Sequence, residues 1–280
     1  MPSASRSPPY ARPVLKGVRP ATGSPGYVPH RQGITGPLAD RLFSTIRVGN
    51  NTRRSKKLEH QELREEVARI ARQMSASGLV HTTSGNVSAR TSEGNILITP
   101  SGLKYEVLEP EDIVLVTLDG EVLEGSLEPS SEVPMHTGLY RSKPHVGGVV
   151  HTHAPYATAL ACLGLEIPPV HYLVAALSEE GRVPLAPYAT YGTEELAGYA
   201  SHALGDSHSV CLLQNHGTIA VGETVSQAYV VTEILEEMAE IYYRTKLAGE
   251  PILLSPEQVA DTRAKIVSYG QTKTVAGETE

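Results

Sequence analysis

The sequence contains no tryptophan and a single phenylalanine, Phe43, so tyrosine, leucine, isoleucine and valine must fill the hydrophobic core. Its two cysteines, Cys162 and Cys211, each lie inside an apolar segment, which excludes a disulfide framework. No run of about 18 apolar residues is present, so no membrane-spanning helix is expected. No charged and then apolar leader opens the chain. These absences predict a protein of a reducing compartment, the cytoplasm, that does not enter a membrane.

Acidic residues are almost missing from the first 57 positions. This segment holds 11 lysines and arginines and one acid, Asp40, and it is rich in proline, serine and glycine. The remaining residues hold 13 basic and 30 acidic side chains, so a basic extension of net charge +10 precedes an acidic body of net charge −17. Such an extension buries too little apolar surface to offset the entropy cost of ordering. We therefore expect residues 1–57 to be a disordered extension and residues 58–280 to form the folded domain.

The purpose of the extension stays open at this point. Its arginine- and serine-rich, acid-poor composition resembles an organellar transit peptide, although the frequent prolines oppose the amphipathic helix that such a peptide needs. A translation start placed too far upstream is a second explanation. A salt-sensitive contact of the extension with an acidic partner or with nucleic acid is a third, although nucleic-acid binding is not expected of the protein as a whole.

Helix-like and strand-like segments intermix over the rest of the chain. Apolar residues recur at helical spacing from Leu63 to Met74, and Asp119-Gly120 between two apolar runs is a hairpin signal. The other expected helices are 131–142, 154–163, 193–204, 224–248 and 256–267. The expected strands are 86–90, 95–99, 112–118, 121–123, 182–186, 209–213 and 219–221, together with one that ends at His151 to His153. The sequence therefore predicts an α/β or α+β fold with one core.

Histidines stand at the ends of two apolar runs. One run leads into His151-Thr152-His153, and another, Val210–Leu213, leads into His216. Side chains alternate along a strand, so His151 and His153 are expected to point to one face and to grip one ion. Three neutral imidazoles leave a zinc-type ion with an open position, which is typical of catalytic sites. The alternative is that each histidine is only a hydrogen-bonded strand end.

Three polar loops have the composition of an anion site. Ser130-Ser131-Glu132 stands at an expected helix start, where hydroxyls and free backbone N–H groups favour phosphate, although an ordinary N-cap has the same residues. Gly85-Asn86 and Ser101-Gly102 combine close backbone approach with polar donors, but turns use these residues too. No GxGxxG or Walker sequence occurs, so nucleotide chemistry has little support.

Two side chains near the third loop can assist a metal. Glu132 is suited to be a fourth metal ligand or a proton carrier, because carboxylates serve both purposes. His136 follows it by one helical turn. This histidine either orients Glu132 or has a surface or capping role, and the sequence does not decide between the two.

Seven segments in order resemble the class II aldolase/adducin family, and in particular its aldolases of L-fuculose 1-phosphate. They are Gly85–Ser88, Ile98–Gly102, Pro129–Glu132, Val150–His153, Ile167–Tyr172, Ala186–Thr193 and Leu213–Gly217. The likeness runs from about residue 58 to the end of the chain. It implies a central, largely antiparallel sheet flanked by helices on both faces, and a homotetramer with each active site at a subunit interface.

The resemblance also implies a metal and its surroundings. One Zn²⁺ per subunit would be held by His151, His153 and His216, with Glu132 beside it as ligand and catalytic group. The substrate phosphate would be bound by residues of the three polar loops, namely Gly85, Asn86, Ser101, Gly102, Ser130 and Ser131.

Three tyrosines have a counterpart in the family or depart from it. Tyr172 matches a tyrosine that donates a proton in the neighbouring subunit's site, and Tyr269 matches one on the mobile C-terminus. Tyr191 stands where close relatives carry phenylalanine on the aldehyde side. That departure leaves the aldehyde preference open.

The activity implied is the reversible cleavage of a ketose 1-phosphate to dihydroxyacetone phosphate and a small aldehyde. L-Fuculose 1-phosphate and a 5-deoxypentulose or ribulose 1-phosphate are the candidate substrates, and neither the aldehyde nor the stereochemistry is settled. The same scaffold serves sugar-phosphate 4-epimerases and a methylthioribulose-1-phosphate dehydratase, but the epimerases generally carry aspartate in place of Glu132. A non-enzymatic adducin-like module lacks the metal, and the three histidines argue against it.

Overall fold

The computed structural model describes residues 59–268, so the expected disordered extension over residues 1–57 lies outside the described residues. Six α-helices lie within the described part: α2 (Gln61–Ala76), α3 (Val133–Ser142), α4 (Pro155–Cys162), α5 (Glu194–Leu204), α6 (Val225–Ala248) and α7 (Pro256–Ser268). The strands there are β1 (Asn86–Arg90), β2 (Ile96–Ile98), β3 (Val114–Val116), β4 (Val122–Glu124), β5 (Gly148–Thr152), β6 (Leu185–Ala186), β7 (Val210–Leu213) and β8 (Gly217–Gly222). Three short 3-10 helices, η1 (Tyr105–Val107), η2 (Pro110–Asp112) and η3 (Tyr172–Ala176), lie in the connections.

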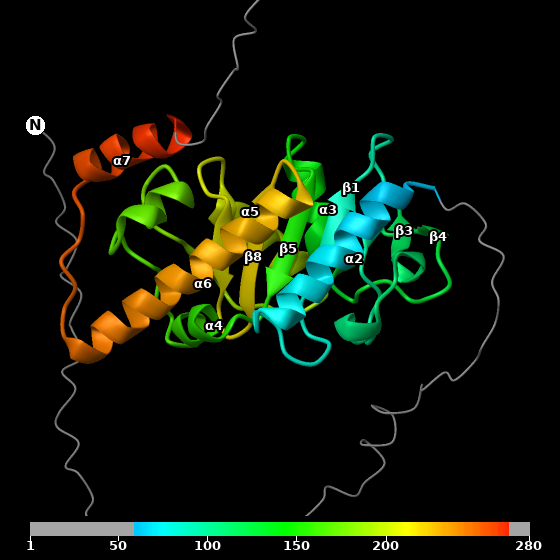
Figure 1. Cartoon of the computed structure of the whole chain (residues 1–280), viewed down its shortest axis with the longest axis horizontal. Helices are drawn as coiled ribbons and strands as arrows, with labels where there is room; N and C mark the ends of the chain where they lie inside the picture. Colours follow the sequence, from blue (N-terminus) through cyan, green and yellow to red (C-terminus); the bar gives the residue numbers. More distant parts are fainter. Residues whose placement is uncertain (1–58, 269–280) are drawn as a thin grey trace, which may run out of the picture. The chain divides into compact units, whose positions relative to one another are not determined.

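These strands form one sheet in the order β4-β3-β2-β1-β5-β8-β7-β6 (Figure 1). Every neighbouring pair is antiparallel except β6 and β7, which are parallel. The prediction of a central, largely antiparallel sheet is confirmed. Strand β5 lies between β1 and β8, and all five of its residues are buried.

The alternation of side chains along the strands builds a hydrophobic core on each face of the sheet, so the expectation of one core is wrong. On β5, Val150 joins the core beneath α2, α4 and α6, while Val149 joins the core beneath α3 and α5. On β1, Val87 and Ala89 belong to the first core, so Asn86 and Ser88 point to the α3 face. His151 lies two residues after Val149 and points to that face as well.

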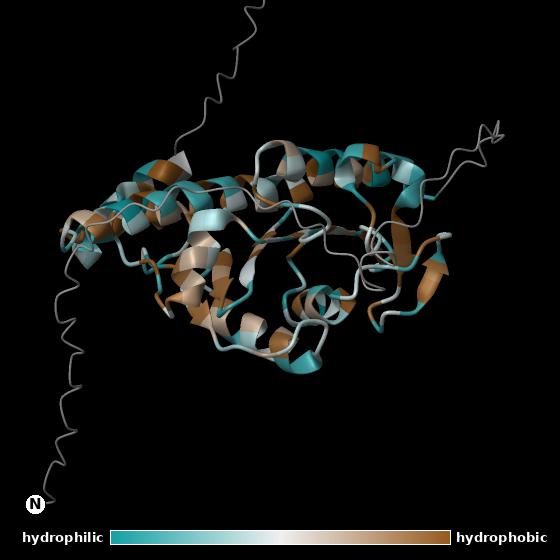
Figure 2. Cartoon of the chain, turned by 90° about the horizontal axis from the view of Figure 1, so that it is seen from below, coloured by the Kyte–Doolittle hydropathy of each residue, from teal (hydrophilic) through white to brown (hydrophobic). Residues whose placement is uncertain are grey.

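Helices cover both faces of the sheet, as the resemblance implies. Helices α2 and α6 cross one face side by side (Figure 1). Figure 2 shows further helices on the opposite side of the strands, and the helices carry both hydrophilic and hydrophobic residues. Amphipathic helices of this kind bury their apolar stripe against the sheet and leave the polar side to solvent.

Local departures from the expected elements occur next to the site. Helix α3 begins at Val133 rather than near 131, with Glu132 as its N-cap residue. His153 lies one residue beyond the end of β5, and His216 lies in the turn between β7 and β8. Strand β6 keeps only two residues of the expected 182–186. Because His153 and His216 lie outside the strands, their side chains do not follow the alternation of the sheet.

We expect Gly148→Ala to destabilise the protein, because a Cβ there would lie 2.4 Å from the backbone nitrogen of Val225 at the start of α6. Overpacking of a rigid contact costs about 1–3 kcal/mol. Gly198→Ala is the matched control, since Gly198 is exposed on α5 with open space around it and alanine favours helix by about 0.5–1 kcal/mol. Thermal unfolding at one fixed protein concentration should separate the two variants, and equal midpoints would contradict the close approach.

Candidate metal centre and active site

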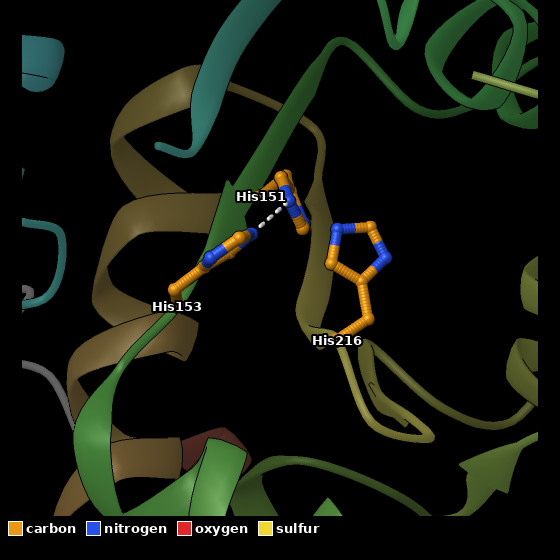
Figure 3. A group of neighbouring side chains, drawn as sticks. All are labelled: His151, His153 and His216. Carbon is orange, nitrogen blue, oxygen red and sulfur yellow. Dashed lines mark hydrogen bonds between the residues drawn. The ribbon is translucent and has the colours of Figure 1, made fainter. Parts of the chain in front are cut away.

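The three histidines come together at one end of the sheet, with their rings facing a common space (Figure 3). One ring nitrogen from each of His151, His153 and His216 lies within 4.8 Å of the others. The Nε2 atoms of His151 and His153 are 3.1 Å apart. The expected pairing of His151 and His153 on one ion is therefore matched by the geometry, and His216 completes a group that can hold a metal.

Each of the three imidazole rings can offer an unprotonated nitrogen to a metal. A hydrogen bond sets the tautomer of His151, and burial keeps His153 and His216 neutral. The Nδ1 atom of His151 lies 2.7 Å from the carbonyl oxygen of Thr218, so Nδ1–H donates there and Nε2 is free to coordinate. Burial, together with the charge of His151, lowers the pKa of His153 and His216 to about 4. Both rings are thus neutral at physiological pH, which is the state that binds metal.

Glu132 adds a carboxylate to the group. It is 6% exposed, and its Oε2 lies 3.0 Å from Nε2 of His151 while its Oε1 lies 3.4 Å from Nε2 of His216. Burial raises the pKa of this carboxyl, but the neighbouring imidazole of His151 and the hydrogen bond from Asn86 outweigh it and hold the pKa below its ordinary value. Oε1 has no hydrogen-bond partner among the described residues.

This donor set fits a divalent cation. Three neutral imidazole nitrogens with a buried carboxylate are ligands that zinc takes in catalytic sites. A buried carboxylate oxygen without a hydrogen-bond donor is costly unless a charge completes its surroundings. A cation among the three rings and Glu132 would take up the nitrogen lone pairs and would also balance the buried carboxylate oxygen.

Backbone hydrogen bonds join the loop of Ser101 to the segment that leads to Glu132. The amide of Ser130 donates to the carbonyl oxygen of Thr99 at 3.1 Å, and the amide of Ser101 donates to that of Glu128 at 2.9 Å. The hydroxyl of Ser130 accepts from the amide of Glu132 at 3.2 Å. These bonds bring the second and third polar loops side by side at the start of α3.

The predicted loops line one pocket together with His153 and His216, two of the three histidines. All six residues predicted to bind phosphate are in its wall with Glu132, His153, His216 and Tyr191. Ser84, which belongs to the first polar loop, also lines the pocket, and sequence reasoning assigned no role to three other wall residues, Thr83, Tyr188 and Asn215. Asn215 has a φ of 54° in the turn before His216. Its position next to that histidine in the sequence could have marked it as a residue of the site.

Gly85 lets the first polar loop approach β5 closely. Its φ is +80°, and a Cβ there would lie 2.8 Å from the carbonyl oxygen of His151. Only glycine adopts this conformation without strain in so narrow a space. The loop can therefore lie directly beside the histidines.

The three tyrosines have different surroundings. Tyr191 lines the pocket and is 65% exposed. Tyr172 lies on η3, is 52% exposed and is not among the residues that line this pocket. Tyr269 lies outside the described residues.

A set of buried polar residues lies behind Glu132. The Nδ2 atom of Asn86 donates to Oε2 of Glu132 at 2.9 Å, so this side chain contacts the carboxylate. His136 is fully buried against Asn86 and Ser88. The alternative of a surface position for His136 is wrong, because its ring fills the space between α3 and β1.

Comparisons with known proteins agree with this architecture. Residues 65–243 match the family model of the class II aldolase and adducin N-terminal domain. The 5-deoxy-D-ribulose 1-phosphate aldolase of Bacillus thuringiensis serovar kurstaki is 44% identical over 212 residues, which are 75% of this chain and 98% of that protein. The 5-methylthioribulose-1-phosphate/5-deoxyribulose-1-phosphate aldolase of Rhodospirillum rubrum is 41% identical over 208 residues, 74% of this chain and 92% of that protein.

A solved structure described as L-fuculose 1-phosphate aldolase is similar with a TM-score of 0.70 at 34% identity, covering 74% of this chain and 96% of that chain. Fold and sequence thus define one class, the lyases that make and break carbon–carbon bonds by aldol chemistry. The chain belongs to the class II aldolase and adducin family, as its seven segments predicted, and it is an aldolase. None of the helices in the described part of the chain has the length and hydropathy needed to span a bilayer.

Proposed function

We propose that this protein is a zinc-dependent aldolase that cleaves a 5-deoxypentulose 1-phosphate, or a closely related ketose 1-phosphate, into dihydroxyacetone phosphate and a small aldehyde. One observation carries the proposal: His153, His216, Glu132 and the three polar loops share one pocket, and the buried His151 joins them through its Nε2, which lies 3.0 Å from Oε2 of Glu132. A phosphate in the loops would place the carbonyl end of a short ketose beside the histidines. The reaction breaks the bond between C3 and C4: a base takes the C4 hydroxyl proton as C4 becomes the aldehyde carbon, and C3 keeps the electron pair and is then protonated.

The metal would be held by His151, His153 and His216, with Glu132 at its side, and we propose one zinc ion per subunit. When bound, zinc would polarise the keto oxygen and stabilise the negative charge that cleavage leaves on the triose phosphate half. No lysine Schiff base is then needed as an electron sink.

The phosphate would be bound where three loops meet. Ser130 and Ser131 precede α3 and would contribute their hydroxyl groups, because the first turn of this helix contains Pro134 and the amides of Val133 and Met135 already donate to carbonyl oxygens. Ser101 and Gly102 supply a hydroxyl and a close backbone, and Gly85 with the backbone of Asn86 completes the cradle. These contacts orient the substrate without taking part in bond cleavage.

Glu132 would carry the proton at the carbon that becomes nucleophilic, since its carboxylate lies beside the histidines and is ionised. Tyr191 would contact the aldehyde half from the pocket wall. Tyr172 and Tyr269 would act in the site of a neighbouring subunit within a homotetramer, and the exposed position of Tyr172 supports this. Two free cysteines support a reducing compartment, the cytoplasm.

The choice of substrate rests on the relatives. The two relatives described above, at 44% and 41% identity, are named as aldolases of 5-deoxyribulose 1-phosphate, whereas the solved L-fuculose 1-phosphate aldolase is 34% identical. A 5-deoxypentulose has a shorter aldehyde half than a 6-deoxyhexulose. Tyr191, with its hydroxyl added to the aldehyde side, leaves less room for a long aldehyde than phenylalanine would.

A panel of ketose 1-phosphates, assayed with zinc for release of dihydroxyacetone phosphate, tests the proposal. We expect kcat/KM for 5-deoxyribulose 1-phosphate to exceed that for L-fuculose 1-phosphate by about ten- to a hundredfold, the scale of one added methylene or hydroxyl in a pocket. Ketose without phosphate is the control and should be cleaved far more slowly. Substrate consumed without release of triose phosphate would contradict aldol cleavage and would indicate epimerisation or dehydration.

A further inference from the structure

A fully buried histidine that the cleavage step does not use lies behind Glu132. His136 follows Glu132 by one turn of α3, and its ring lies against β1. Its Nδ1 is 2.6 Å from the hydroxyl of Ser88, and its Nε2 is hydrogen-bonded to Oδ1 of Asn86. Ser88 is in turn 2.9 Å from the hydroxyl of Tyr140.

The hydrogen bonds of this group have one consistent direction. Asn86 donates through Nδ2 to the carboxylate of Glu132, so its Oδ1 must face His136 and accept from Nε2–H. Nδ1 of His136 is then unprotonated and accepts a hydrogen bond from the hydroxyl of Ser88. The oxygen of Ser88 is left to accept from Tyr140. Each donor along this chain therefore points toward Glu132.

The register of the sheet places the chain beside the histidines. Asn86 is paired with His151 across β1 and β5, and both point to the α3 face. Oε2 of Glu132 thus lies between two fixed groups, Nδ2 of Asn86 at 2.9 Å and Nε2 of His151 at 3.0 Å.

We propose that His136 is a positioning residue: it fixes the carboxamide of Asn86 with its N–H toward Glu132, and thereby sets the orientation of the carboxylate that serves the metal and the proton transfer. An amide that is free to flip can turn its oxygen toward the carboxylate, where two acceptors repel each other. Nε2–H of His136 prevents the flip, because it can bond only to the amide oxygen. The inference rests on the proposed function, since it assigns a task to Glu132.

Three substitutions separate this task from simple packing. His136→Gln places an amide N–H near the position of Nε2 and keeps the bond to Asn86. His136→Asn is shorter, so its amide stays near Ser88 and does not reach Asn86. His136→Leu fills a similar volume without a donor. We expect kcat to fall about tenfold for the Asn and Leu variants, the lower end of the range for residues that orient metal ligands, and to stay within about threefold for the Gln variant. KM should change less than kcat, because the serine loops are untouched.

A second readout does not depend on turnover. The enzyme substituted with Co²⁺ should bind one ion per subunit in every variant, with visible d–d absorption shifted for the Asn and Leu variants and close to wild type for the Gln variant. In the Glu132→Gln background, adding His136→Leu should slow cleavage no further, because residues that act through one another are not additive.

Equal kcat for the Gln and Asn variants, or a folded Leu variant as fast as wild type, would overturn the positioning role. A Leu variant that does not fold leaves the Gln and Asn pair to decide. Multiplying effects in the double variant would show that His136 acts independently of Glu132. A wild-type enzyme that releases no triose phosphate would refute the proposed function instead, and the cobalt spectra would still test whether His136 orients the metal's surroundings.

Discussion

Enzyme stripped of divalent metal by a chelator is expected to lose its cleavage activity about a thousandfold and to regain it with zinc. Loss of the cation removes several kcal/mol of charge stabilisation in the transition state, and each 1.36 kcal/mol is a factor of ten in rate. The fold should survive, since a hydrophobic core on each face of the sheet holds the helices in place. Triose phosphate release and metal content, measured on one sample, check this result.

His151→Ala is the matching substitution, because His151 is the fully buried member of the three and lies between His153 and Glu132. We expect this variant to bind zinc poorly and to show the same loss of activity without recovery on adding zinc. His202→Ala is the control, since His202 is exposed on α5, and it should keep both metal and activity. A His151→Ala protein with full metal content would contradict the assignment of this ligand.

Replacement of Glu132 by glutamine is expected to leave zinc bound while cleavage falls about a hundredfold or more, the usual scale for a positioned acid or base. Glutamine keeps the shape of the side chain, so its oxygen can still accept from Nδ2 of Asn86. What it loses is the charge and the ability to take a proton. Steady-state kinetics and metal analysis of the same preparation separate loss of chemistry from loss of metal.

The control for this substitution is Glu111→Gln, which removes the same charge from an exposed position on η2. It should leave kcat within about twofold of wild type, as surface changes away from a site usually do. Full activity of Glu132→Gln with zinc bound would refute the role of Glu132. Loss of zinc in that variant would make Glu132 a required ligand rather than the proton carrier.

Much of the fold was predictable because local periodicity determines which side chains are buried. The apolar run before His151 predicted the buried strand β5, and the apolar stripe of α6 predicted a long helix capped by Thr224, whose side chain accepts from the amide of Gln227. The parallel pairing of β6 was beyond reach, since two residues contain no period.

The site was predictable where a motif contains its own chemistry. His151-Thr152-His153 together with His216 favoured a metal site by residue type and spacing, and the loop of Ser130 has the composition of an anion site or of an ordinary N-cap at a helix start. The bonds that unite them are long-range: Asn86 contacts Glu132 across 46 positions of sequence, and Ser88 contacts His136 across 48. Such contacts depend on the register of the sheet, and a single sequence does not reveal that register.

The most direct measurement is a zinc titration of the metal-stripped enzyme, with bound zinc and dihydroxyacetone phosphate release followed together. If the three histidines hold one catalytic ion, activity should rise in proportion to bound zinc and level off at one ion per subunit. Stripped enzyme that cleaves the ketose 1-phosphate as fast as the zinc-loaded enzyme would contradict the account.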